Sequence, residues 1–452
     1  MKHFPKWKSA FRFVDAEDKN FRLIFFSLLI GLIVGLLGAA FRLFLSYIEG
    51  LRLQLFSEAS IHDFSTWLIP IALVVVGGGV ALFLVKRFAP EASGSGVHEI
   101  EGALDELRPL HWKRVIPVKF IASLFSLGGG FLLGREGPTI QLGANIGKMV
   151  RDVFKQDKNK DNALISAGAA AGLASAFNAP FSGIIFVMEE MHGHFKYSFF
   201  SLAAIMLASS TADLVVRLLV GGSVVIKMTI FHMPPLSLMW MFILLGALFS
   251  VIGLGFNKLL IFALDFFGKL SVNMTIIAVL IVGLIIAVIG IVAPEMIGGG
   301  YQTIGMALEH SFTMQFLVIL FVGRMLLTIF SYGLGLPGGI FAPLLALGVV
   351  MGMLFGGIMQ HYFPGQIEHS GVFAVAGMAA IFAATVRAPL TGIILAVEMT
   401  SNFELLLPLI ITVVTSSLLT TQMGNQPIYT ILLERTLERK NIKEKKLPKD
   451  LS

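Results

Sequence analysis

The stretch "FNAPFSGIIFVMEEM" at residues 177–191 returns as "VRAPLTGIILAVEMT" at residues 386–400. Both copies keep an Ala-Pro pair and, three residues later, a Gly-Ile-Ile run. A second repeated block lies upstream of each copy, in which Gly134, Pro138, Leu142, Gly143 and Gly147 match Gly339, Pro343, Leu347, Gly348 and Gly352. Two blocks repeated in the same order predict two homologous halves, which we place at about 20–215 and about 235–430.

The composition around these blocks is that of a membrane protein. The 452 residues are 56% hydrophobic and only 14% charged, whereas soluble proteins carry about 25% charged residues. Apolar runs near the length that crosses a bilayer, about 20 residues, recur at Leu23–Tyr47, Trp67–Val85, Phe199–Val220, Met239–Leu264, Thr275–Ala293 and Leu405–Leu419. No alternating ten-residue strand pattern of a membrane barrel accompanies them. We therefore expect an all-α polytopic membrane protein.

Basic residues gather at both ends of the chain. By the positive-inside rule, a cytoplasmic segment 1–22 and a cytoplasmic tail 431–452 flank a transmembrane domain at 23–430, with an even number of crossings. The net charge of +6 is then explained by membrane orientation, and a nucleic-acid partner is not expected. The chain has no cysteine, which excludes disulfides and thiol chemistry.

Glycine and proline interrupt the apolar sequence in a way that favours anion binding. The interruptions are "SGSGVHEIEGAL" (93–104), "GREGPTIQLG" (134–143), "GLPGGIFAPLLALG" (335–348) and the Ala-Pro pairs at 179–180 and 388–389. Each precedes a helix, whose first turn has unpaired N–H groups that attract anions. Broken helices in paired repeats are typical of transporter sites near the bilayer midplane. A duplicated scaffold without transport is the alternative, but interrupted helices are costly unless they line a cavity.

Glu136 is the one acidic residue between Glu106 and Asp152. A carboxylate near helix N-termini occupies the place that a free anion would take, and protonation would release it. Anion occupancy and proton binding would then compete. The alternative is a local ion pair with Arg135, but adjacent side chains point apart. An ionisable residue within a membrane is a functional candidate by default.

Two hydroxyl groups are further candidates as anion ligands. Ser95 lies between Gly94 and Gly96, and Tyr429 is one of six tyrosines. Each has a commoner interpretation: an N-cap serine and an aromatic anchor at the membrane interface.

Together, "GSGVHEIEGAL", "GREGPTIQLG", "GGIFAPLLALG" and the late tyrosine resemble the CLC family of chloride channels and chloride/proton exchangers, over about 85–430. The chain looks closest to the bacterial exchangers, which lack cytoplasmic regulatory (CBS) domains. The resemblance implies two inverted-topology halves of tilted, partly re-entrant helices. It also implies a homodimer with one pathway per subunit, in a bacterial inner membrane.

The resemblance assigns roles to particular residues. Ser95 and Tyr429 would contact chloride through hydroxyls, and Ile340 and Phe341 through backbone N–H groups. Glu136 would be the external gating and proton glutamate. Glu190 would be the internal proton-transfer glutamate, supported by Glu189. The supporting residues are Gly94, Gly96, Lys119, Arg135, Gly137, Pro138 and Gly339.

Glu190 distinguishes the two functions within the family, because channels typically lack an acid there. We therefore expect a secondary active antiporter that exchanges chloride for protons; the alternative is a passive voltage- or pH-gated chloride channel. Without the family, Glu189 and Glu190 would also fit a solvated helix end. The serine and the "GREGP" motif favour chloride over nitrate and fluoride. No cofactor, no metal and no enzymatic activity are expected, since no thiol, HExxH or Gly-x-Ser-Gly motif is present.

Five other residues are weaker candidates. His98 replaces a proline common in the family and could add pH sensitivity, or be a tolerated substitution. Lys119 either raises the local potential for anions or snorkels to the surface. His192 and His194 are too few for a metal site. Glu398, which matches Glu189 in the repeat, is expected to be structural.

Overall fold

The computed structural model describes residues 7–60, 62–156, 161–191, 198–309 and 312–446. His192, His194 and the outermost parts of both predicted cytoplasmic segments lie outside these ranges. The first half of the chain contains α1 (Trp7–Ser57), α2 (Leu68–Phe88), α3 (Val97–Leu104), α4 (Trp112–Gly128), α5 (Glu136–Val153), α6 (Asp161–Phe177), α7 (Pro180–Glu190) and α8 (Phe199–Leu219). The second half contains α9 (Met239–Gly268), α10 (Val272–Val292), α11 (Tyr301–Glu309), α12 (Met314–Gly333), α13 (Phe341–Tyr362), α14 (Gly371–Thr385), α15 (Pro389–Thr400), α16 (Leu406–Gln422) and α17 (Ile428–Lys446). Short 3-10 helices lie at Phe64–Trp67, Pro90–Ala92, Leu236–Leu238 and Pro294–Met296.

Seven helical segments among the described residues are long and apolar enough to cross a membrane. Five contain most or all of an apolar run predicted from the sequence; the other two are Met314–Gly333 and Phe341–Tyr362. The run at Leu405–Leu419 forms α16, which is one of four shorter apolar helices. The prediction of an all-helical polytopic membrane protein is confirmed.

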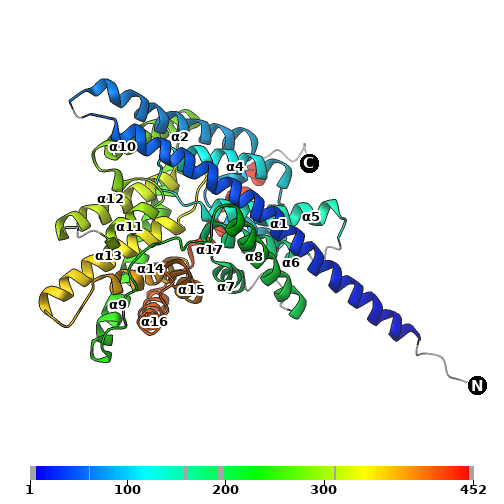
Figure 1. Ribbon diagram of the computed structural model, residues 1–452. Helices are drawn as coiled ribbons and strands as arrows, with labels where there is room; N and C mark the ends of the chain where they lie inside the picture. Colours follow the sequence, from blue (N-terminus) through cyan, green and yellow to red (C-terminus); the bar gives the residue numbers. More distant parts are fainter. Residues whose placement is uncertain (1–6, 61, 157–160, 192–197, 310–311, 447–452) are drawn as a thin grey trace, which may run out of the picture.

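The helices form a bundle that is traversed by the long α1 (Figure 1). α1 runs diagonally across the view, and its N-terminal end projects away from the other helices. The short helices α7 and α15 lie toward the lower middle of the picture and pack against each other. Helices too short to cross a bilayer thus end inside the protein, where other chain segments surround their polar ends.

Glycines determine how closely the paired helices of each half approach. A Cβ added at Gly143 of α5 would lie 2.0 Å from the carbonyl oxygen of Gly168 on α6. A Cβ at Gly348 of α13 would lie 2.5 Å from the carbonyl oxygen of Gly377 on α14. The sequence repeat aligns Gly143 with Gly348 and Gly168 with Gly377, so both copies of the repeat make the same backbone contact.

We expect Gly143→Ala to destabilise the protein by about 1–3 kcal/mol or more, because the methyl group meets rigid backbone. Gly255→Ala is the matched control: it lies within α9 with nothing within 4 Å of an added Cβ, and helix propensity alone favours alanine by about 1 kcal/mol. Thermal unfolding of both variants in detergent would measure the difference. Equal midpoints for the two variants would contradict the close packing of α5 on α6.

Candidate anion and proton site

Three glycine-rich loops meet through backbone hydrogen bonds. The Gly94 N–H donates to the Leu336 carbonyl oxygen (3.2 Å), and the Gly338 N–H donates to the Gly94 carbonyl oxygen (2.9 Å). Gly134 and Gly339 exchange a pair of N–H to carbonyl bonds, each 2.7 Å long. The loops before α3, α5 and α13 are therefore joined at one place, although they come from both halves of the chain.

The glycines allow this approach because side chains would not fit. A Cβ at Gly137 would lie 2.8 Å from Ser95 Cα, and one at Gly339 would lie 2.9 Å from the Gly137 backbone nitrogen. Gly96 has a φ of +84°, and a Cβ there would meet the Gln141 side chain at 2.2 Å. The predicted supporting glycines thus bring Ser95 and the first turns of α5 and α13 together.

Ser95 is fully buried. Its hydroxyl oxygen accepts from the Val97 N–H at 3.2 Å, while its own N–H donates to the Tyr332 hydroxyl oxygen at 3.4 Å. The N-cap position of α3 is Gly96, not Ser95. Because the serine oxygen only accepts in the Val97 contact, its hydroxyl proton remains available to an anion.

Tyr429 lies in the first turn of α17 and is fully buried. This burial contradicts the interpretation as an interfacial anchor. Its ring stacks near that of Phe341, with centroids 6.2 Å apart. Its hydroxyl forms no hydrogen bond of normal geometry within the described part of the chain, and the Ser95 side chain lies within hydrogen-bonding reach of it. An unpaired buried hydroxyl is costly, so this one marks a place for a polar ligand.

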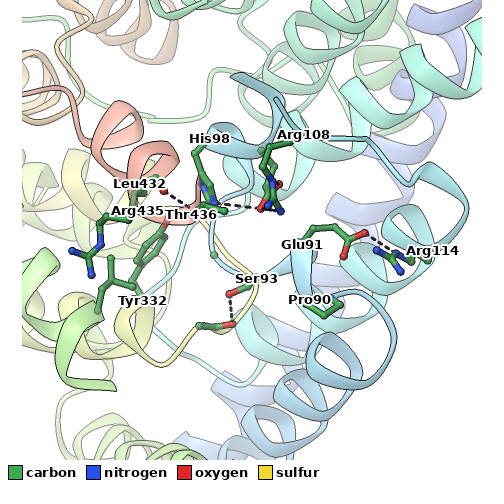
Figure 2. A pocket seen from close by; sticks show the side chains of 14 residues that line it. Pro90, Glu91, Ser93, His98, Arg108, Arg114, Tyr332, Leu432, Arg435 and Thr436 are labelled. Carbon is green, nitrogen blue, oxygen red and sulfur yellow. Dashed lines mark hydrogen bonds and ion pairs between the residues drawn. The ribbon is translucent and has the colours of Figure 1, made fainter. Parts of the chain in front are cut away.

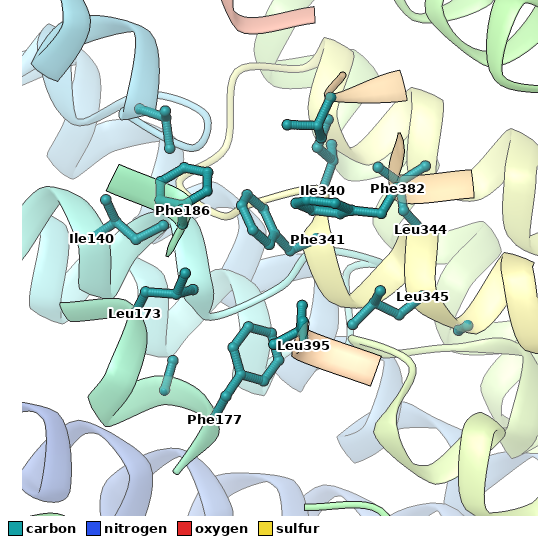
Figure 3. Close-up of a cluster of buried hydrophobic side chains, with 14 of the residues drawn as sticks. Ile140, Leu173, Phe177, Phe186, Ile340, Phe341, Leu344, Leu345, Phe382 and Leu395 are labelled. Carbon is teal, nitrogen blue, oxygen red and sulfur yellow. The ribbon is translucent and has the colours of Figure 1, made fainter. Parts of the chain in front are cut away.

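Ile340 is the N-cap of α13, and Phe341 is its first residue. Both are fully buried. Figure 3 shows the Phe341 ring between Phe186 of α7 and Phe382 of α14, with centroid separations of 5.4 and 4.7 Å. This aromatic packing fixes the start of α13, whose unpaired N–H groups belong to the same region as Ser95.

Glu136 is fully buried at the start of α5. Its Oε2 accepts from the Ala342 N–H in the first turn of α13 at 3.4 Å, and its Oε1 accepts from the Tyr301 hydroxyl. The carboxylate therefore occupies a helix N-terminus of the second half, as the competition hypothesis predicts. Arg135 forms no ion pair with it among the described contacts; its guanidinium instead lies 4.4 Å from the centre of the Tyr301 ring.

Lys119 of α4 is completely buried, so the snorkelling alternative is wrong. Its ammonium group donates to the carbonyl oxygens of Ala92 (2.9 Å) and Gly94 (2.6 Å). Both contacts support the loop that carries Ser95. Pro138, also buried, lies in the first turn of α5, where a missing N–H costs no helical hydrogen bond.

Glu189 and Glu398 cap each other's helices. The Glu189 carboxylate accepts from the N–H groups of Leu390 (2.9 Å) and Thr391 (2.7 Å) at the start of α15. The Glu398 carboxylate accepts from those of Phe181 (3.1 Å) and Ser182 (2.7 Å) at the start of α7. The structural role expected for Glu398 is confirmed, and the solvated-end alternative is wrong for Glu189. A carboxylate on helix N-terminal N–H groups is stabilised by charge-assisted bonds.

Glu190 follows Glu189 at the end of α7 and is half-buried. The cap made by Glu189 fixes its backbone against α15. Glu190 interacts electrostatically with Glu101 of α3 and with Tyr429. Glu190 therefore lies near Tyr429, whereas Glu136 lies near Tyr301.

A cavity of about 550 Å³ opens beside the Ser95 loop. Figure 2 shows His98, Arg108, Tyr332 and Arg435 around it, and its wall also includes Gly94. Each arginine in the wall has an acidic partner, such as Glu99 for Arg108 at 2.6 Å. His98 lines this cavity with its Nδ1 unpaired among the described residues. Gly94 and Tyr332, which both contact the Ser95 loop, are part of the cavity wall.

The sequence analysis did not identify Tyr301 as a site residue, although its hydroxyl contacts Glu136 directly. The residue follows the Gly298–Gly300 run, and 165 positions separate it from Glu136. A tyrosine after three glycines was the available signal, but no spacing rule connects it with α5. No group of three potential metal-binding side chains occurs among the residues that the structure describes.

The family model for the voltage-gated chloride channel matches residues 77–421. The chain belongs to this family. Its model covers most of the chain, including the glycine-rich loops and both copies of the repeat, and thus confirms the resemblance to CLC proteins.

Curated relatives extend the match to nearly the whole chain. The H(+)/Cl(-) exchange transporter ClcA of Vibrio parahaemolyticus is 41% identical, covering 99% of this chain and 97% of the relative. The ClcA of Salmonella agona is 38% identical, covering 96% and 92%. Among solved structures, a slow cyanobacterial Cl-/H+ antiporter superposes with a TM-score of 0.89 at 39% identity, covering 93% of this chain and 99% of that one. A CLC-type fluoride/proton antiporter shares the fold at 20% identity, with a TM-score of 0.73.

Proposed function

We propose that this protein is a secondary active antiporter that exchanges chloride for protons across a membrane. The observation that carries the proposal is the Glu136 carboxylate on the N-terminus of α13, beside the buried hydroxyls of Ser95 and Tyr429. The relatives named above as H(+)/Cl(-) exchange transporters support exchange over the channel alternative.

Chloride would bind between the Ser95 and Tyr429 hydroxyls and the N–H groups of Ile340 and Phe341. These donors carry partial charges only, so the anion is held without a permanent cation and can leave quickly. The roles of these four residues rest on the loop geometry, the burial and the unpaired Tyr429 hydroxyl.

Exchange would follow from competition at the α13 N-terminus. When ionised, Glu136 takes the place of an anion; when protonated, it has no charge to hold it there and chloride can enter. Glu190 would deliver or accept the proton from the other side of the site. A proton bound at Glu136 and a chloride bound near α13 would thus be required in the same cycle.

Assembly and orientation are part of the proposal. We place the protein in a bacterial inner membrane with both termini in the cytoplasm, as the basic ends suggest. A homodimer with one pathway per subunit is expected from the family. The division into two homologous halves is supported by the matched glycine contacts of α5 on α6 and α13 on α14, and their inverted topology is expected from the family.

The test uses purified protein in liposomes with a chloride gradient, while a pH electrode follows the external solution. Antiport predicts that the chloride gradient drives protons uphill until the two gradients balance. Chloride flux without proton movement would establish a channel instead. Liposomes without protein measure the leak.

A further inference from the structure

The exchange mechanism proposed above does not use the contact between Tyr301 and Glu136. Two groups from other helices donate hydrogen bonds to this carboxylate within the described structure: the Ala342 N–H and the Tyr301 hydroxyl. Tyr301 is half-buried, whereas Glu136 is fully buried.

The backbone of Tyr301 is held rigidly. Arg324 is fully buried, and its guanidinium donates to the carbonyl oxygens of Ile297 (3.1 Å) and Gly298 (2.9 Å) just before α11. Gly298 and Gly300 adopt positive φ angles of 73° and 112°, a conformation that suits glycine. The loop that delivers the phenol is thus fixed by a buried cation.

The ring of Tyr301 is also held on both sides. The Arg135 guanidinium lies 4.4 Å from its centre, within cation–π range. The Phe177 ring at the end of α6 contacts it edge-on, with centroids 6.3 Å apart. A phenol confined by these neighbours aims its hydroxyl at Glu136 with little loss of side-chain entropy.

We propose that Tyr301 is a positioning residue that latches the ionised Glu136 carboxylate onto the N-terminus of α13. The inference rests on the exchange function proposed above. A phenol O–H is a donor to the ionised carboxylate, and protonation of the carboxylate weakens that bond. The latch therefore opposes protonation and keeps chloride out until protons are abundant.

Other charges around Glu136 set the baseline on which this latch acts. Arg135 is the charged side chain that acts on Glu136 directly. Arg42 and Glu49 of α1 face Arg135, while Arg52 of α1 faces Glu49 and Asp213 of α8 faces Arg42. All of them remain when the phenol hydroxyl alone is removed. A change caused by Tyr301→Phe is thus attributable to the lost contacts of the hydroxyl group, which involve Glu136 and also Arg135.

In Tyr301→Phe, we expect the pH of half-maximal exchange to rise by about one unit. The reason is that a hydrogen bond to a charged group favours the ionised carboxylate over the protonated form by about tenfold or more. Initial rates would be measured in liposomes from pH 4 to pH 8 for the unaltered protein and the variant. Chloride exchange near neutral pH should increase, while protons remain coupled because both glutamates are present. Tyr362→Phe, an identical change at a side chain that is 72% exposed, is the matched control.

Tyr301→Leu separates the hydroxyl from the ring. The latch predicts that both variants shift the pH profile upward; a shift in Tyr301→Leu alone would assign the effect to ring packing and overturn it. An unshifted or lowered profile in Tyr301→Phe would also overturn it. If the unaltered protein pumps no protons in the same liposomes, the exchange function itself fails, and the two failures are therefore distinguishable.

Discussion

In Glu136→Ala, we expect chloride flux to persist while proton flux falls by about 100-fold or more. A positioned proton-transfer group usually accelerates proton transfer by at least this factor. The carboxylate that occupies the α13 N-terminus is gone, so nothing on the chain competes with chloride there. Ser95, Tyr429 and the backbone donors remain in place. Because alanine cannot carry a proton, chloride movement loses its link to protons.

The measurement compares chloride efflux with uphill proton movement in the same liposomes. Glu368→Ala is a suitable control, since this side chain is 74% exposed and removes an equal charge. Proton pumping that survives in Glu136→Ala would show that another group carries the proton, and would remove Glu136 from its proposed role.

Glu190→Gln is expected to abolish most proton flux, again by about 100-fold or more, with chloride flux retained. Glutamine keeps the size and shape of the side chain but cannot exchange a proton. The residue borders the α7 end of the site and does not contact the α13 N-terminus in any described hydrogen bond, so the anion donors should be undisturbed.

Glu398→Gln provides the matched comparison for Glu190→Gln. It also removes one carboxylate charge. Glu398 lies near the end of α15, the repeat counterpart of α7, and caps the N-terminus of α7. We expect it to cost about 1 kcal/mol of stability and to leave proton coupling intact. Equal loss of coupling in both variants would indicate that helix capping, and not proton transfer at Glu190, controls exchange.

The sequence by itself determined the architecture and most of the candidate site. Apolar runs of bilayer length predicted five of the seven candidate spans among the described residues, because a bilayer leaves few alternatives to helices. Glycine and proline residues that recur at the same spacing in both halves located the loops before α5 and α13. The isolated Glu136 stood out because an unpaired carboxylate in so apolar a chain requires a reason.

Only the tertiary structure decided which groups surround those residues. Lys119 had two open interpretations until its burial and its bonds to Ala92 and Gly94 excluded snorkelling. The mutual caps of Glu189 and Glu398 require α7 and α15 to lie side by side, although Glu189 and Leu390 are 201 positions apart in the sequence. The contact of Tyr301 with Glu136 depends on a glycine loop held by Arg324. Such contacts form by packing between distant segments, whereas sequence periodicity reports only local geometry along one segment.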